Sequence, residues 1–121
     1  MLIQVQVNGN INNTVRLSNS YDGDLLLTSC EIIMDPVTAT NDTPVVHLPF
    51  LENWSVNNAG KGIVVPQTAN LRYHLKGPIL FKNIHVPEQF TVRINKQEDG
   101  TVFNSLSSDF ERLVITFQTL G

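Results

Sequence analysis

Three histidines, His47, His74 and His85, are the residues of this chain that could form a metal site. Three imidazoles on one surface with an open fourth position would suit zinc. No two of them have the short spacing that is typical of metal ligands. His74 also alternates with Arg72 and Lys76, which would repel a cation. The sequence therefore predicts no metal ion.

Other polar clusters also fall short of a reactive site. Asp22 and Asp24 flank Gly23 in a predicted turn, whereas a calcium loop needs six or more ordered oxygen ligands. A cluster of serines near Asp109 has no nucleophile elbow and no evident histidine partner; its members are Ser105, Ser107 and Ser108. We expect no catalytic residue, no cofactor and no enzyme activity.

Composition sets further limits on the class of protein. The 121 residues carry a formal charge of -3, and only 16% of them are charged. Lys and Arg are spread along the chain, so no cationic surface for nucleic acid is expected. The beginning of the chain has no basic segment followed by an apolar run, and no later run reaches the ~20 apolar residues of a membrane span. We expect no signal peptide and no transmembrane segment.

Cys30 is the single cysteine, so the sequence allows no internal disulfide. It lies in the apolar run from Leu25 to Met34, where a thiol is typically a small buried hydrophobe. That run ends at Asp35-Pro36, and apolar residues occupy both its odd and its even positions. It predicts a central strand covered on both faces.

Alternation of apolar and polar residues predicts strands elsewhere. Residues 90–94 and 113–117 each place apolar side chains on one face, around a turn predicted at Asp99-Gly100. Ile3 to Val7 alternates before an Asn8-Gly9 turn and predicts an opening hairpin with 15–17, or a bulged strand. Other predicted strands are Val45–Leu48, Ile63–Val65, Leu71–Lys76 and Ile79–Ile84, the last two separated by a turn at Gly77-Pro78.

These segments predict an all-β fold. We expect residues 1–121 to form a single-domain antiparallel β-sandwich that is jelly-roll-like, with about eight or nine strands. A jelly roll is favoured over an immunoglobulin-like fold, because the cysteine and tryptophan pattern of the latter is missing.

A sugar-binding module would use exposed aromatic rings as stacking platforms. Trp54, Tyr21 and Tyr73 are the candidates. Trp54 lies in an irregular segment and could be such a platform, but a single tryptophan in a sandwich is more often buried. A carbohydrate- or receptor-binding head domain is therefore the alternative hypothesis, with a glycan as the possible ligand.

The hypothesis of self-assembly depends on other residues than the sugar-binding hypothesis does. The faces of the strands at 2–7 and 112–119 that point away from the core carry Gln, Thr and Val with few charges. If these strands lie at a sheet edge, little in their sequence opposes lateral pairing; if they are central, the chain itself covers them. The loops 37–44 and 57–62 are further candidates for contacts with neighbouring subunits. The possible interface or ligand anchors are Phe50, Trp54, Tyr73, Arg93, Thr116 and Gln118.

The rhythm of strands and turns resembles that of a known group of proteins. It is carried by residues 13–24 before an apolar strand, by 86–94, by Asp99-Gly100 and by 112–117. These segments resemble the small β-sandwich structural proteins of double-jelly-roll DNA viruses, including virophages and polinton-like viruses. The resemblance implies a virion component, namely a minor capsid, vertex (penton) or cement protein, or a spike domain. It implies a homo-oligomer or binding to other capsid proteins, and location in the virion. Vertex proteins of these viruses are often larger, which favours a minor capsid role.

Overall fold

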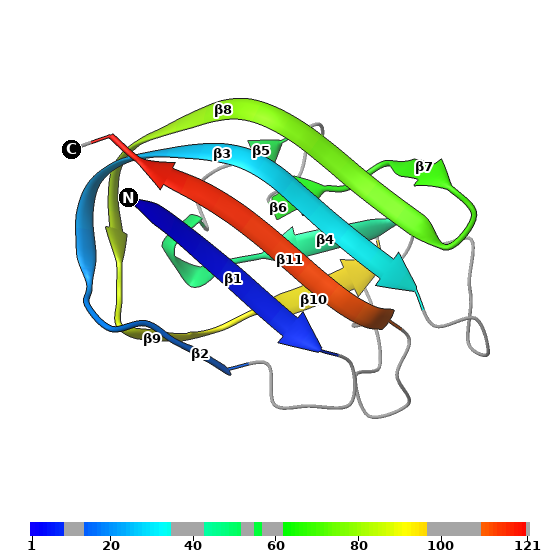
Figure 1. Ribbon diagram of the computed structural model, residues 1–121, viewed down its shortest axis with the longest axis horizontal. Coiled ribbons are helices and arrows are strands. Elements are labelled where there is room, and N and C mark those ends of the chain that lie inside the picture. Colours follow the sequence, from blue (N-terminus) through cyan, green and yellow to red (C-terminus); the bar gives the residue numbers. More distant parts are fainter. Residues whose placement is uncertain (9–13, 35–42, 52–54, 57–61, 97–109, 121) are drawn as a thin grey trace.

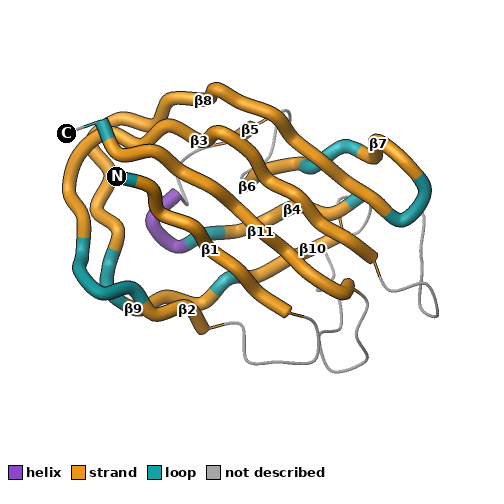
Figure 2. Tube along the Cα trace, viewed as in Figure 1, coloured by secondary structure: helices purple, strands orange, loops and turns teal. Residues whose placement is uncertain are grey.

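The computed structural model describes residues 1–8, 14–34, 43–51, 55–56, 62–96 and 110–120, and these ranges are almost entirely strand (Figure 2). The prediction of an all-β fold is confirmed. No helix in these ranges is long and apolar enough to cross a membrane. The elements are β1 (Leu2–Asn8), β2 (Thr14–Arg16), β3 (Tyr21–Met34), β4 (Pro44–His47), the 3-10 turn η1 (Pro49–Leu51), β5 (Ser55–Val56), β6 (Gly62–Val64), β7 (Gln67–Ala69), β8 (Arg72–Val86), β9 (Gln89–Thr91), β10 (Arg93–Lys96) and β11 (Phe110–Thr119).

The strands pair as one long hairpin that has been rolled up. β1 pairs with β11, β2 with β9, β3 with β8, and β4 with β6, all antiparallel. Rolling adds a second set of antiparallel pairs, β11 with β3 and β10 with β4. This nested pairing is the jelly-roll arrangement, as the sequence predicted.

Two layers result from this pairing. The first sheet has the strand order β1-β11-β3-β8-β7 and forms the front layer in Figure 1. The second layer lies behind it and contains the sheets β10-β4-β6-β5 and β2-β9. Only Val92 separates β9 from β10, so the two small sheets follow one another along the same layer.

The hydrophobic core lies between the two layers, and every second side chain along the strands of each layer points into it. The apolar faces that the sequence predicted in 90–94 and 113–117 are buried there. Phe50 from η1 contacts Phe90 of the second layer edge-on, with ring centroids 5.0 Å apart, and contacts Phe117 of the first sheet at 6.2 Å. These three rings join the two layers by contacts that add to the stabilisation from burial alone.

β8 corrects one prediction from the sequence. Gly77-Pro78 does not turn the chain, because Arg72–Val86 is one continuous strand that pairs with β3 along its length. A Cβ atom at Gly77 would collide with the backbone oxygen of Leu27. The glycine therefore allows the backbones of β3 and β8 to approach closely at this point.

The prediction of an opening hairpin was wrong, and the two later alternating strands are not neighbours either. β9 and β10 lie in the second layer, while β11 lies in the first sheet. β1 and β2 are likewise in different sheets. Asp99-Gly100 lies outside the described residues. Alternation along a strand is a local property, whereas the strand partner is chosen by packing of the whole chain.

β3 differs from its prediction in two ways. Asp22 to Asp24 belongs to the strand and makes no turn; a register shift in the pairing with β8 lies between Gly23 and Leu25. Leu25, Leu27, Cys30 and Ile32 are buried, but the side chains between them are only half-buried. The strand is central, yet only one of its faces is covered by the rest of the described chain.

Replacing Leu27 by alanine tests the core. Its side chain is fully buried, so Leu27→Ala should lower the free energy of unfolding by about 2–5 kcal/mol. Leu80→Ala on the neighbouring strand is the matched control, since Leu80 is 41% exposed and should cost less than about 0.5 kcal/mol. Urea unfolding of dilute protein measures both. Equal losses for the two variants would contradict the assigned core.

Candidate functional site

The first candidate surface is the outer face of the first sheet, which we define as the side chains of β1, β11, β3 and β8 that point away from the core. Its middle is a shallow depression of about 400 Å³. The lining includes Gln4, Gln6, Ser29 and Thr116, which are neutral polar residues from three adjacent strands. Such groups can form hydrogen bonds with a partner at a low desolvation cost compared with charges.

Glu31 and Arg112 form the ion pair of this depression. The Arg112 Nη2 and Glu31 Oε1 atoms are 3.7 Å apart, and both side chains are more than 40% exposed. His74 lies opposite Glu31 on the neighbouring strand. An exposed pair of this kind stabilises the fold by only about 0–1 kcal/mol. Its geometry is that of a solvated surface pair.

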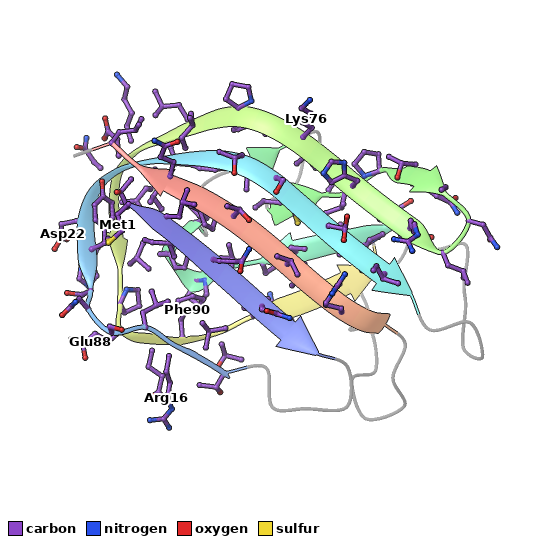
Figure 3. All side chains as sticks on the ribbon, in the orientation of Figure 1. Met1, Arg16, Asp22, Lys76, Glu88 and Phe90 are labelled. Atoms are coloured by element: carbon purple, nitrogen blue, oxygen red, sulfur yellow. The ribbon has the colours of Figure 1, made fainter. Side chains whose placement is uncertain are left out.

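One end of the outer face is apolar. Leu2 lies opposite Gln118, Gln118 opposite Leu26, and Leu26 opposite Leu80, so the register forms a row across the sheet. Leu2 is 65% exposed, and Met1 and Leu120 at the same end are also exposed. Figure 3 shows Met1 at this end, where β11 also finishes. We call Met1, Leu2, Leu80 and Leu120 the apolar end of the outer face.

The second candidate surface is a cleft of about 450 Å³ on the second layer. Leu48, Leu51 and Ile63 supply apolar lining, and His47 and Arg93 supply polar groups. His47 and Arg93 are direct cross-strand neighbours on β4 and β10. A mostly apolar cleft with a few convergent polar groups is typical of a small-ligand site.

Gly62 makes room for the imidazole in this cleft. Its φ is +106°, and a Cβ atom there would lie 2.9 Å from His47 Cε1. Burial lowers the pKa of His47 below its ordinary 6.5, and the nearby Arg93 guanidinium lowers it further. The imidazole is therefore predominantly neutral at pH 7, while Arg93 is the fixed cation of the cleft.

The structure separates the anchors that the sequence predicted. Thr116 and Gln118 lie on the outer face of the first sheet, whereas Arg93 lies in the cleft of the second layer. Phe50 is half-buried against the core, and Tyr73 is only 2% exposed, so its ring offers little surface to a neighbour. Trp54 and most of the loops 37–44 and 57–62 lie outside the described residues.

The histidines do not converge. His74 and His85 are on β8, and His47 is on β4 of the other layer. Among the residues that the structure describes, no group of three or more His, Cys, Asp or Glu side chains could hold a metal ion. His85 Nδ1 instead lies 2.7 Å from Asp22 Oδ1 in an exposed pair. The serines at 105, 107 and 108 lie outside the described ranges.

Cys30 is buried in the core, as the sequence predicted. Desolvation raises the pKa of its thiol to about 12. Because the thiolate is the reactive form, this side chain is inert in the folded protein.

Sequence reasoning missed the cleft and the apolar end. The cleft depends on Arg93 being next to His47, 46 positions apart in sequence, and only the pairing of β10 with β4 sets this. The apolar end depends on the register of four strands. Within the sequence, the one local signal for it was Leu2 on the polar face of an alternating strand.

No protein-family model matches this sequence, and no curated protein matches it either. The geometry of the two surfaces therefore carries the functional argument.

The pKa of His47 provides a test of the cleft. We expect its titration midpoint below 6.5, and Arg93→Gln should raise it without restoring the ordinary value, because burial is the larger cause. The unfolded chain binds this proton at a higher pH than the folded chain does. Protonation of His47 should therefore lower the free energy of unfolding as the pH falls below about 6.5. NMR of the His47 Cε1–H signal measures the midpoint. A midpoint unchanged by Arg93→Gln would contradict the proximity of the two groups.

Proposed function

We propose that this chain is a non-enzymatic structural protein that acts through subunit interfaces, as a minor capsid, vertex or cement component of a virus particle. The jelly roll is a fold of viral capsid proteins and also of lectins, so the fold admits both of our candidate functions. The outer face of the first sheet favours assembly. Its apolar end is the single observation that carries the proposal.

The outer face has the composition of a protein contact. Met1, Leu2, Leu80 and Leu120 are the large apolar side chains that are exposed in the described residues, and they gather at one end of one sheet. Neutral amides and hydroxyls adjoin them. Exposed apolar groups next to polar groups mark interaction surfaces. A stable interface of about 1,600 Å² in total would cover such a face.

The family resemblance points in the same direction. The strand and turn rhythm of segments such as 13–24 and 86–94 implies capsid partners, or further copies of the chain. Apolar and neutral polar faces would provide the affinity. The location that follows from this proposal is the virion.

Light scattering with mass determination tests the assembly proposal. We expect the mass to exceed the 13.5 kDa of one chain as the concentration rises. Leu80→Glu places a charge in the apolar end. It should raise the protein concentration at which the mass begins to increase by about tenfold or more. Gln89→Glu adds the same charge at an exposed position of the second layer and should have no effect. A protein that stays monomeric at high concentration would refute self-assembly.

A carbohydrate- or receptor-binding head domain is the second candidate, and the cleft is the observation that favours it. Arg93 next to His47 above an apolar lining could orient a glycan that carries a carboxylate or sulfate. Trp54 remains the candidate stacking platform from the sequence.

A glycan array compares the two functions. If the cleft binds a glycan, Arg93→Ala should reduce binding by about tenfold or more, as expected for loss of a charged hydrogen bond. Trp54→Ala tests the stacking platform, and Arg16→Ala, which alters an exposed cation on β2, is the matched control. The absence of any bound glycan on the array would remove this alternative.

A further inference from the structure

We propose that two copies of this chain pair through the free edge of β1, antiparallel about a two-fold axis, so that their first sheets become one continuous sheet. This inference rests on the proposed assembly function and names the partner and the contact. The observations that carry it are the direction of the backbone groups of β1, the contrast between the two edges of the sheet, and the residues of β1 itself.

The backbone of β1 has an open side. In the described part of the chain, β1 pairs with β11 alone. The Thr119 N–H donates to the Met1 oxygen at 3.0 Å, so Met1 belongs to a hydrogen-bonded pair with β11. Such pairs alternate along an antiparallel ladder. The N–H and C=O groups of Leu2, Gln4 and Gln6 therefore point away from β11, toward the open side.

The opposite edge of the sheet is built differently. Beyond its short pairing with β7, β8 carries Lys76, Pro78 and Lys82 along the edge. Figure 3 shows Lys76 extending outward from this strand. Asn83, with φ +56°, adds an irregularity near its end. Lysine, proline and irregular backbone are the features by which natural sheets prevent edge pairing.

β1 has none of these protective features. Its sequence, LIQVQVN, is regular, and it contains no charge, proline or glycine. The two edges of one sheet thus differ: one is protected against pairing and the other is suited to it. A regular, uncharged edge of seven residues requires a partner strand to prevent uncontrolled association.

The residues of β1 favour a second copy as that partner. A two-fold axis brings a side chain that lies near it close to its own equivalent, so a charge near the axis would be repelled by the same charge of the partner subunit. β1 has no charged residue along its whole length. A partner of different sequence and opposite charge would find no complementary group on this strand.

One register uses the whole strand and satisfies the direction of its backbone groups. With Val5 on the axis, Gln4 lies opposite Gln6 of the partner subunit, and the open backbone groups of both residues face each other. The two amides can then form a cross-strand hydrogen bond on the outer face. Ile3 lies opposite Val7 of the partner subunit, which extends the apolar inner face across the axis.

Substitutions at the open side test the pairing. Gln4→Pro removes an N–H that β11 does not use, so the monomer should still fold. The protein concentration needed for dimer formation should rise at least tenfold. The double variant Gln4→Lys/Gln6→Lys places lysines opposite lysines and should have the same effect. Gln89→Lys is the matched control, because it adds a lysine at an exposed position of the second layer, away from β1. Sedimentation velocity measures the masses, and circular dichroism measures the fold.

Cysteine cross-linking tests the register. Gln4→Cys and Gln6→Cys proteins, one labelled with ¹⁵N, are mixed and mildly oxidised. Opposed residues in a hydrogen-bonded pair have Cα atoms about 5.5 Å apart, which suits a disulfide. The mixture should give a labelled–unlabelled dimer, and each variant alone should give at least fivefold less dimer. Cys30 is buried and should not compete.

The outcomes separate this inference from the proposed function. A wild-type dimer that is lost in Gln4→Pro and in the double variant, but kept in Gln89→Lys, supports pairing through β1. An oligomer that persists in both edge variants, or cross-links in each variant alone as strongly as in the mixture, overturns the inference and leaves assembly through another surface standing. A wild-type chain that is monomeric at all concentrations overturns both.

Discussion

The pairing of β3 with β8 is the constraint on which the rest of the structure depends. These strands have 14 and 15 residues and pair from Tyr21 opposite Val86 to Ile33 opposite Arg72. At one end both curve over from the first sheet toward β2 and β9 of the second layer (Figure 1). Register shifts within the pair accompany this path, and such irregularities increase bending and twist. The long pair therefore sets the position of both layers.

Burial on a single face explains the two candidate surfaces. Each layer covers the inner face of the other, and the outer side chains of β1, β11 and β3 remain accessible in the described chain. Neutral amides and hydroxyls keep these faces compatible with water and with a protein partner. The apolar end adds side chains that gain free energy when a partner covers them. In the described chain the edge of β1 leaves backbone N–H and C=O groups open, so the same sheet combines an exposed apolar end with an edge whose hydrogen-bonding groups would fix the orientation of a partner strand.

The candidate site was predictable in its parts but not in its assembly. The outward direction of Thr116 and Gln118 followed from alternation with buried Ile115 and Phe117, and it is confirmed. Their separation from Arg93 did not follow, because 90–96 and 110–119 alternate in the same way whether they form a hairpin or lie in opposite layers. Tyr73 shows the same limit: its alternation with Arg72 and His74 implied two faces but did not say which one the core would take.

The sequence by itself determined the class of fold, the alternation of side chains along each strand and the buried thiol of Cys30, since alternation and apolar runs are local consequences of side-chain direction along a strand. The tertiary structure decided which strands are neighbours. It joined Arg72–Lys76 and Ile79–Ile84 into one strand, placed β1 at an edge and β11 between β1 and β3, and brought His47 next to Arg93. Strand partners distant in sequence are selected by the free energy of closing one common core, which no single segment contains.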